Sequence, residues 1–203
     1  MTFEDGKITS GYEGYGRKIN EQSKYCTKVK ELEQIIQIAL LNDQTFINVV
    51  CPFDHEKLRI SKTQEGGRYG LHHDSHLLGD YSTTVFLSDM DEYDGGELVV
   101  KPHNQSAEWI KLPSGFAVTY PSDYPHLVNE VTDGTRLVAL NWTRSKFKDP
   151  SIRRLYANIS SAVNELPMWG EDILTDSDSP RYRLRESLNL LDRQFSREYD
   201  RKQ

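Results

Sequence analysis

The sequence predicts a mainly β domain with flanking helices, and two patterns support this assignment. Between residues 45 and 143, short runs rich in β-branched and aromatic residues alternate with turns that contain glycine or proline. Outside this region, apolar residues recur at three- and four-residue steps, which is the spacing of amphipathic helices. Many short strands with frequent turns favour a barrel or a double-sheet jelly roll over a parallel sheet with crossover helices.

The expected elements follow one another in a simple order. The first 26 residues are polar and without a period, which indicates a loop or an edge segment, and residues 27–41 carry the apolar stripe of a helix that should pack on a sheet. Strands are expected at 45–50, 56–62, 82–87, 97–101, 108–112, 116–120, 127–131 and 136–142, with Asp133-Gly134 as the last turn. Two helices should follow Asp149-Pro150, one ending near Pro167 and one beginning at Ser179-Pro180, with a loop over 169–179 between them.

Length, charge and cysteine content set further limits. The 203 residues suit a single domain, with an N-terminal segment and supporting helix at 1–44, a jelly-roll core at 45–148 and C-terminal helices at 149–203. Two cysteines, no signal-like N-terminus and no long apolar run predict a reduced, cytoplasmic protein that does not enter a membrane. The net charge of −6 argues against a nucleic-acid partner, and the sequence leaves the oligomeric state open.

A candidate metal site begins with His72 and Asp74, which lie two residues apart. Positions i and i+2 of an extended strand project from the same face, so this pair can direct an imidazole and a carboxylate at one point. His73 would face the other side, and His126, at the start of a later strand, would supply the third ligand. Two histidines and one carboxylate leave metal positions open, as non-haem Fe(II) oxygenases require for a co-substrate and O2.

Arg136, ten residues after His126, suggests what the co-substrate is. An arginine that points into a β-barrel is a costly buried charge unless an anion pairs with it. Guanidinium binds a carboxylate through two parallel hydrogen bonds, so a dicarboxylate could reach Arg136 with one end and the metal with the other.

Plainer interpretations stand beside the metal site. A His-x-Asp pair such as His72 and Asp74 is common by chance, and His126 could be a hydrogen-bonded histidine at a strand end. Arg136 could form a surface salt bridge with an acidic residue such as Asp133. Of the remaining histidines, His76 is near enough in sequence to donate to the site or contact a substrate.

With these residues in place, residues 62–149 resemble the 2-oxoglutarate- and Fe(II)-dependent dioxygenases of the prolyl 4-hydroxylase superfamily, in particular the bacterial PKHD-type hydroxylases. The matching motifs are Gly66-Gly67, Tyr69-Gly70-Leu71-His72-His73-Asp74, Ser82-Thr83-Thr84-Val85-Phe86-Leu87-Ser88-Asp89, Asp91, Tyr93-Asp94-Gly95-Gly96-Glu97-Leu98, Leu112-Pro113-Ser114-Gly115, Tyr120-Pro121-Ser122, His126 and Gly134-Thr135-Arg136-Leu137. Weaker similarity extends to both sides, over Asp5-Gly6-Lys7, Thr9-Ser10-Gly11-Tyr12 and the C-terminal helices.

The resemblance implies a double-stranded β-helix and a specific division of roles. It implies that His72, Asp74 and His126 hold Fe(II), that Arg136 holds the C5 carboxylate of 2-oxoglutarate, and that O2 is the second co-substrate. Further co-substrate contacts are implied for Thr63, Tyr69 and Thr84, and ascorbate is admitted as an additional cofactor. The implied reaction hydroxylates a C–H bond of a prolyl peptide, a protein or a small molecule and releases succinate and CO2.

Two departures and two rival functions complete the expectations. Thr63 stands where relatives often have a tyrosine, and the chain begins where the first helix of relatives has already ended, so an N-terminal element is expected to be shortened or absent. The first rival is a cupin-like jelly roll that binds a metal and a small ligand without oxidising it. The second is a scaffold that binds a partner through the charged helix at 181–201.

Overall fold

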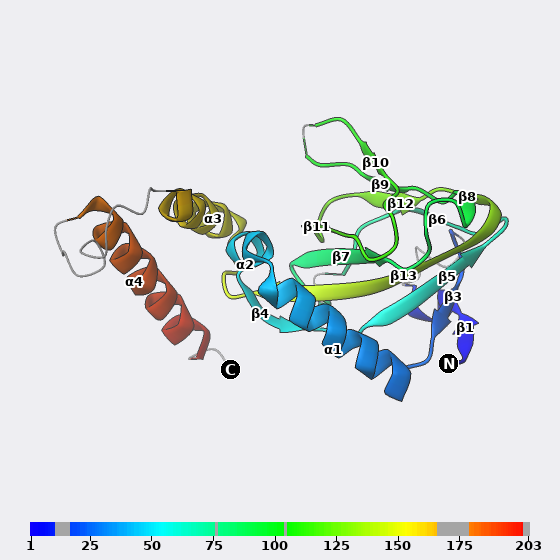
Figure 1. The fold of residues 1–203 in the computed structure, drawn as a ribbon, viewed down its shortest axis with the longest axis horizontal. Helices are drawn as coiled ribbons and strands as arrows, with labels where there is room; N and C mark the ends of the chain where they lie inside the picture. The colour runs from blue at the N-terminus through cyan, green and yellow to red at the C-terminus, as the bar shows by residue number, and fades with distance from the viewer. Residues whose placement is uncertain (11–16, 76, 104, 166–178, 201–203) are drawn as a thin grey trace. The chain divides into compact units, whose positions relative to one another are not determined.

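The computed structural model describes residues 1–10, 17–75, 77–103, 105–165 and 179–200 (Figure 1). The predictions for His76, for the helix end near Pro167 and for the loop before Ser179 lie outside the described residues. Contacts divide the chain into two compact units, one formed by residues 1–38 and 54–144 and the other by residues 39–53 and 145–203. The candidate site belongs to the first unit.

Two antiparallel sheets build the first unit and give the predicted mainly β, jelly-roll architecture (Figure 1). The larger sheet has the order β1 (Phe3–Asp5), β3 (Glu21–Ser23), β5 (Arg59–Gln64), β13 (Val131–Ser145), β7 (Tyr81–Phe86) and β11 (Ala117–Pro121), with β4 (Pro52–His55) and β8 (Tyr93–Gly95) also paired to β13. The smaller sheet has the order β10 (Glu108–Ile110), β9 (Leu98–Val100), β12 (His126–Val128), β6 (Arg68–His72) and β2 (Lys18–Ile19). Of the first 26 residues, where a loop or an edge segment is expected, β1 and β2 each form the edge of a sheet, whereas β3 lies between β1 and β5.

Apolar side chains from both sheets pack around the site. Leu98 and Val100 of the smaller sheet form one buried cluster with Tyr120 of the larger sheet. All six residues of β7 are buried, and Val138 and Ala139 of the neighbouring β13 are no more than 1% exposed. Because strands alternate their faces, this burial fixes which side chains of each strand enter the space between the sheets.

Helix α1 (Thr27–Asn42) forms where the apolar stripe predicts it, but its buried face is different from the predicted one. Val29 and Ile36 are buried as expected, whereas Ile35 is 64% exposed. The buried face instead includes Glu33, whose carboxylate accepts hydrogen bonds from the Leu58 backbone N–H (2.7 Å) and the Tyr25 hydroxyl (2.6 Å). Apolar periodicity cannot detect a buried glutamate that gains its partners from two loops.

The strand predicted at 45–50 is wrong, because these residues lie in helix α2 (Gln44–Val50). Asp43 caps its N-terminus by accepting a hydrogen bond from the Phe46 backbone N–H (2.7 Å), and Cys51 ends it in a left-handed conformation. Local capping therefore outweighs the β propensity of the segment. Helices α3 (Pro150–Glu165) and α4 (Pro180–Asp200) confirm the two predicted C-terminal helices, and a short 3-10 helix, η1 (Gly6–Thr9), follows β1.

Two remaining sequence predictions concern cysteines and membranes. Cys26 and Cys51, the two cysteines of the chain, are not joined in a disulfide. Among the helices in the described part of the chain, none combines the length and the apolar character that crossing a bilayer requires.

Candidate metal centre and co-substrate pocket

The two candidate histidine ligands come from neighbouring strands of the smaller sheet. His126 of β12 lies directly opposite His72 of β6, and their ring centroids are 4.2 Å apart. Each Nδ1 lies 2.9 Å from a backbone carbonyl oxygen, that of Gly70 for His72 and that of Tyr124 for His126. Since a carbonyl oxygen only accepts, both Nδ1 atoms carry a proton and donate it, which leaves both Nε2 atoms as the nitrogens that can bind a metal.

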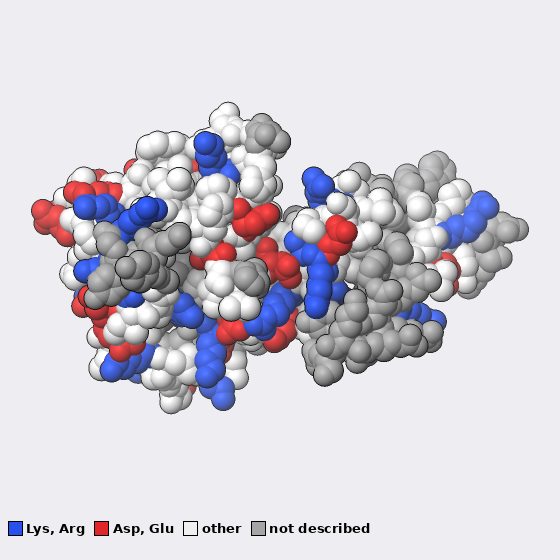
Figure 2. Space-filling view, turned by 180° about the vertical axis from the view of Figure 1, so that it is seen from behind, with Lys and Arg blue, Asp and Glu red and all other residues white. Residues whose placement is uncertain are grey.

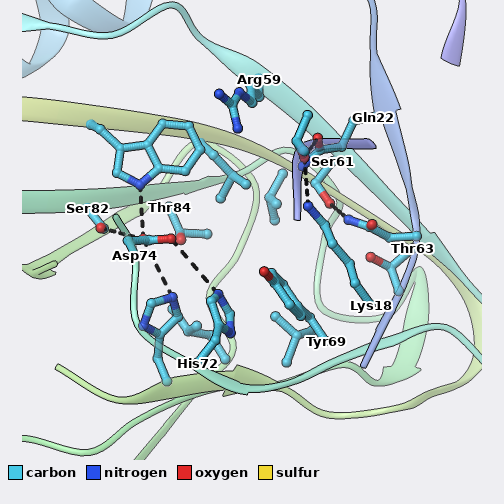
Figure 3. Close-up of a pocket in the computed structure, with 18 of the residues that line it drawn as sticks. Lys18, Gln22, Arg59, Ser61, Thr63, Tyr69, His72, Asp74, Ser82 and Thr84 are labelled. Carbon is cyan, nitrogen blue, oxygen red and sulfur yellow. Dashed lines mark hydrogen bonds and ion pairs between the residues drawn. The ribbon is translucent and has the colours of Figure 1, made fainter. Parts of the chain in front are cut away.

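The candidate carboxylate ligand, Asp74, follows the end of β6 and is fixed by the larger sheet (Figure 3). Its Oδ2 accepts hydrogen bonds from the Ser82 hydroxyl (2.6 Å) and from the Trp142 indole N–H (2.9 Å). The Nε2 atoms of His72 and His126 lie 3.9 and 3.5 Å from its two oxygens. The carboxylate is therefore held between two imidazoles on one side and two neutral donors on the other.

This cluster has the donor set that a non-haem iron requires. The ligand atoms of His72, Asp74 and His126 all lie within 4.8 Å of one another. Burial, followed by the neighbouring His126, lowers the pKa of His72 to about 4, so this imidazole is neutral near pH 7 and available as a ligand. Two imidazole nitrogens and one carboxylate oxygen directed at one point fit Fe(II). His73 is exposed and its Nδ1 donates to the Asp123 carbonyl, so it takes no part in the cluster.

Arg136 is buried in the same pocket, at 2% exposure. It lies on β13 opposite Thr63 of β5, and its guanidinium carbon is 5.7 Å from the centroid of the Phe86 ring. Among the described residues, its Nε has no hydrogen-bond partner. The alternative of a surface salt bridge with Asp133 is wrong, because Arg136 is buried and Asp133 is exposed. Burial lowers the pKa of Arg136, and an anionic ligand would offset that cost.

The turn predicted at Asp133-Gly134 is also wrong, because these residues continue β13 and pair with β8. The register shifts between Val131 and Asp133, and Gly134 takes a φ of +76°, so the irregularity is a bulge within one long strand. Arg136 therefore lies inside a strand, where its pairing with Thr63 of β5 fixes its direction.

All seven residues that the sequence analysis assigned to the site line one cavity of about 660 Å³. Besides the three candidate ligands and Arg136, it is lined by Thr63, Tyr69 and Thr84. The Tyr69 ring stacks on that of His72 with centroids 3.6 Å apart, and both threonines are at most 3% exposed. The cavity is large enough for a dicarboxylate beside a second small molecule or a side chain.

Sequence reasoning missed two features that shape this pocket. The hydrogen bond from Trp142 to Asp74 could have been anticipated, because Trp142 lies six residues after Arg136 on one strand and even spacing places both on one face. Lys18, only 4% exposed, also lines the cavity. It comes from a segment without any periodic pattern, so no sequence signal indicated its position.

Comparisons with known proteins agree with this geometry. The sequence model of the 2OG-Fe(II) oxygenase superfamily matches residues 58–144. A PKHD-type hydroxylase of Stenotrophomonas maltophilia is 34% identical over 83% of this chain and 79% of its own length, and one of Picosynechococcus is 37% identical over 81% and 77%.

Solved structures show the same fold. A 2OG-Fe(II) oxygenase-family oxidoreductase from Burkholderia pseudomallei aligns with a TM-score of 0.53 at 14% identity, over 70% of this chain and 73% of its own. A prolyl hydroxylase from Trichoplax adhaerens, solved with a peptide fragment, aligns with a TM-score of 0.54 at 14% identity, over 75% and 73%. The double-stranded β-helix core is thereby confirmed, and the chain belongs to the PKHD-type hydroxylases of the 2OG-Fe(II) oxygenase superfamily.

Proposed function

We propose that this protein is a 2-oxoglutarate- and Fe(II)-dependent dioxygenase that hydroxylates a C–H bond of its substrate and releases succinate and CO2. His72, Asp74 and His126 hold the iron, and Arg136 binds the C5 carboxylate of 2-oxoglutarate. Bound Fe(II) supplies the activation of O2 that couples decarboxylation of the co-substrate to oxidation of the substrate. The primary substrate is a prolyl peptide, another protein segment or a small molecule.

One observation carries the proposal. A donor set of two imidazoles and one carboxylate shares one cavity with a buried guanidinium that has a hydrogen-bond donor unused by the described residues. A metal and a dicarboxylate together would use these groups. The chain's contribution is to orient: backbone carbonyls fix both imidazoles, Ser82 and Trp142 fix Asp74, and β13 fixes Arg136.

The direct test is turnover of 2-oxoglutarate. Protein incubated with Fe(II), ascorbate, O2 and 2-oxoglutarate should form succinate above a protein-free control. Omitting ascorbate tests whether this reductant is needed. Failure of the metal-loaded protein to bind or turn over 2-oxoglutarate would refute the proposal, whereas binding without succinate would favour the cupin-like alternative.

The role of Arg136 is tested separately by binding. In Mn(II)-loaded protein without O2 chemistry, Arg136→Ala should weaken 2-oxoglutarate binding at least ~tenfold, because a charged hydrogen bond contributes roughly 1.5–3 kcal/mol. Arg136→Lys keeps the charge but not the two-point geometry, so it should fall between Ala and the wild type. Arg154→Ala, on an exposed position of α3, is the matched control. Wild-type affinity in Arg136→Ala would remove Arg136 from the site.

A further inference from the structure

The cavity carries an excess of positive charge that the protein as a whole does not. Among its described lining residues, Arg17, Lys18, Arg59, Arg68 and Arg136 are basic and Asp74 is the one acid. The whole chain, in contrast, has 25 basic and 31 acidic residues, and on the face shown in Figure 2 the two kinds are interspersed. Arg136 is assigned to 2-oxoglutarate above, and Arg68 pairs with Glu130 at 2.7 Å, which leaves Arg17, Lys18 and Arg59 to be explained.

Lys18 is the most buried of the remaining cations, at 4% exposure. It lies on β2 next to Tyr69 of β6, and its ammonium group is 4.9 Å from the centroid of the tyrosine ring. Its side chain extends toward Ser61 and Gln22, and its ammonium group donates to the Thr9 hydroxyl at 2.9 Å (Figure 3). Its hydrogen-bond partner is a neutral hydroxyl, and within the described ranges no salt bridge involves Lys18, although Asp74 and Asp5 act on it electrostatically.

Arg59 borders the same part of the cavity from the larger sheet. It lies on β5, and its guanidinium carbon is 5.0 Å from the centroid of the Trp142 ring. Trp142 donates to Asp74, so this guanidinium is separated from the candidate metal cluster by one aromatic ring. Arg59 and Lys18 line the same cavity, and the pKa of Lys18 is lowered first by burial and then by the charge of Arg59, while Asp74 and Asp5 act in the opposite direction. No carboxylate in the described part of the chain forms an ion pair with Arg59.

We propose that Lys18 and Arg59 form a second anion-binding subsite, which holds a carboxylate or phosphate group of the primary substrate beside the iron. This inference rests on the proposed function, since it assigns Arg136 to 2-oxoglutarate. Two like charges held near each other in a cavity repel, and an anion placed between them removes the repulsion and supplies acceptors for their free N–H groups. Asp74 does not fill this role, because the metal engages it. The substrate is therefore an acidic molecule or an acidic side chain.

The test measures anion binding with the co-substrate site already filled. Protein loaded with Mn(II) and 2-oxoglutarate is titrated calorimetrically with N-acetylglycine, with its neutral amide and with inorganic phosphate. N-acetylglycine should bind at least ~tenfold more tightly than the amide, because only the acid forms charge-assisted hydrogen bonds. Tighter binding of phosphate than of N-acetylglycine would assign the subsite to phosphate esters, and the reverse order would assign it to carboxylates.

Variants locate the binding and supply the control. Lys18→Met and Arg59→Met should each weaken anion binding ~tenfold or more. Lys62→Met is the matched control, because Lys62 lies on β5 as Arg59 does but pairs with Glu21 and does not line the cavity. Retained 2-oxoglutarate binding shows that a variant is folded. If Lys18→Met proves unstable, Arg59→Met still tests the subsite, because Arg59 is only half-buried.

Several results would overturn the subsite: equal binding of the acid and the amide, no binding of either anion to the wild type, wild-type affinity in both variants, or displacement of 2-oxoglutarate by the anions. Failure of the proposed function looks different, because the wild type would then not bind 2-oxoglutarate at all. In that case the titration is run with Mn(II) alone. Anion binding that is lost in Lys18→Met but kept in Arg136→Ala would still support the subsite.

Discussion

Replacing Trp142 with phenylalanine removes one of the two side-chain hydrogen bonds that fix the Asp74 carboxylate. The lost bond, 2.9 Å from the indole N–H to Oδ2, has a charged acceptor, and such bonds contribute roughly 1.5–3 kcal/mol. Ser82 still donates to the same oxygen at 2.6 Å, so the effect should lie at the lower end of this range. We therefore expect Trp142→Phe to weaken metal binding ~tenfold, in line with other residues that support metal ligands.

The assay is a competition titration of Mn(II) against a chelator, with the free energy of unfolding measured in parallel. Trp109→Phe is the matched control, because Trp109 is 67% exposed and does not line the cavity. Combining Trp142→Phe with Ser82→Ala should reduce metal affinity by more than the sum of the two single changes, since each single variant keeps one of the two donors to Asp74 and the double variant keeps neither. Equal metal affinity in Trp142→Phe and Trp109→Phe would refute the reasoning.

Three further predictions follow from the same geometry. Gly96→Ala should weaken 2-oxoglutarate binding, measured by calorimetry, more than Gly115→Ala does. Both glycines have a positive φ, but a Cβ at position 96 would lie 3.1 Å from the Cδ of Arg136, whereas a Cβ at position 115 would meet nothing within 4 Å. Burial, followed by the charge of Arg59, lowers the pKa of Lys18 from 10.5 to about 8. Between these two pH values the folded state binds fewer protons than the unfolded state, so the free energy of unfolding should increase with pH. The urea midpoint of the wild type should therefore rise between pH 8 and 10.5, relative to that of Lys18→Met. Mn(II) at about 100 times its Kd should stabilise the wild type by ~2.7 kcal/mol, an effect that thermal unfolding should show to be lost in His72→Ala and kept in His73→Ala.

The part of the site that sequence predicts is the part set by local strand geometry. The ligand atoms of His72 and Asp74 converge as their spacing of two residues predicts, although β6 ends at His72 and Asp74 lies beyond the strand. The position of Arg136 was predictable for a different reason, since a motif places it ten residues after His126. The actual approach of His126 to His72 depends on the pairing of β12 with β6, which no local pattern encodes.

The errors have a common physical origin. Residues 45–50 have strong β propensity, yet the Asp43 cap makes them a helix. Asp133-Gly134 has the composition of a turn, yet pairing with β8 keeps it within β13. Glu33 and Lys18 are buried although their charge predicts exposure. Glu33 accepts a hydrogen bond from the Leu58 backbone N–H, and Lys18 donates one to the Thr9 hydroxyl. In each case an interaction between segments far apart in the sequence, or a single capping residue, outweighs the average tendency of the segment.

The two sheets divide the candidate site between them, and this division has a consequence for metal binding. Both imidazoles belong to neighbouring strands of the smaller sheet, whereas the Asp74 carboxylate is hydrogen-bonded to Ser82 and Trp142 of the larger sheet. A bound cation would therefore link the two layers, and its affinity would depend on their separation. That separation is set by packing of the buried cluster formed by Leu98, Val100 and Tyr120. Because close-packed cores resist small displacements, this cluster keeps the three ligand atoms near their binding positions before a metal arrives.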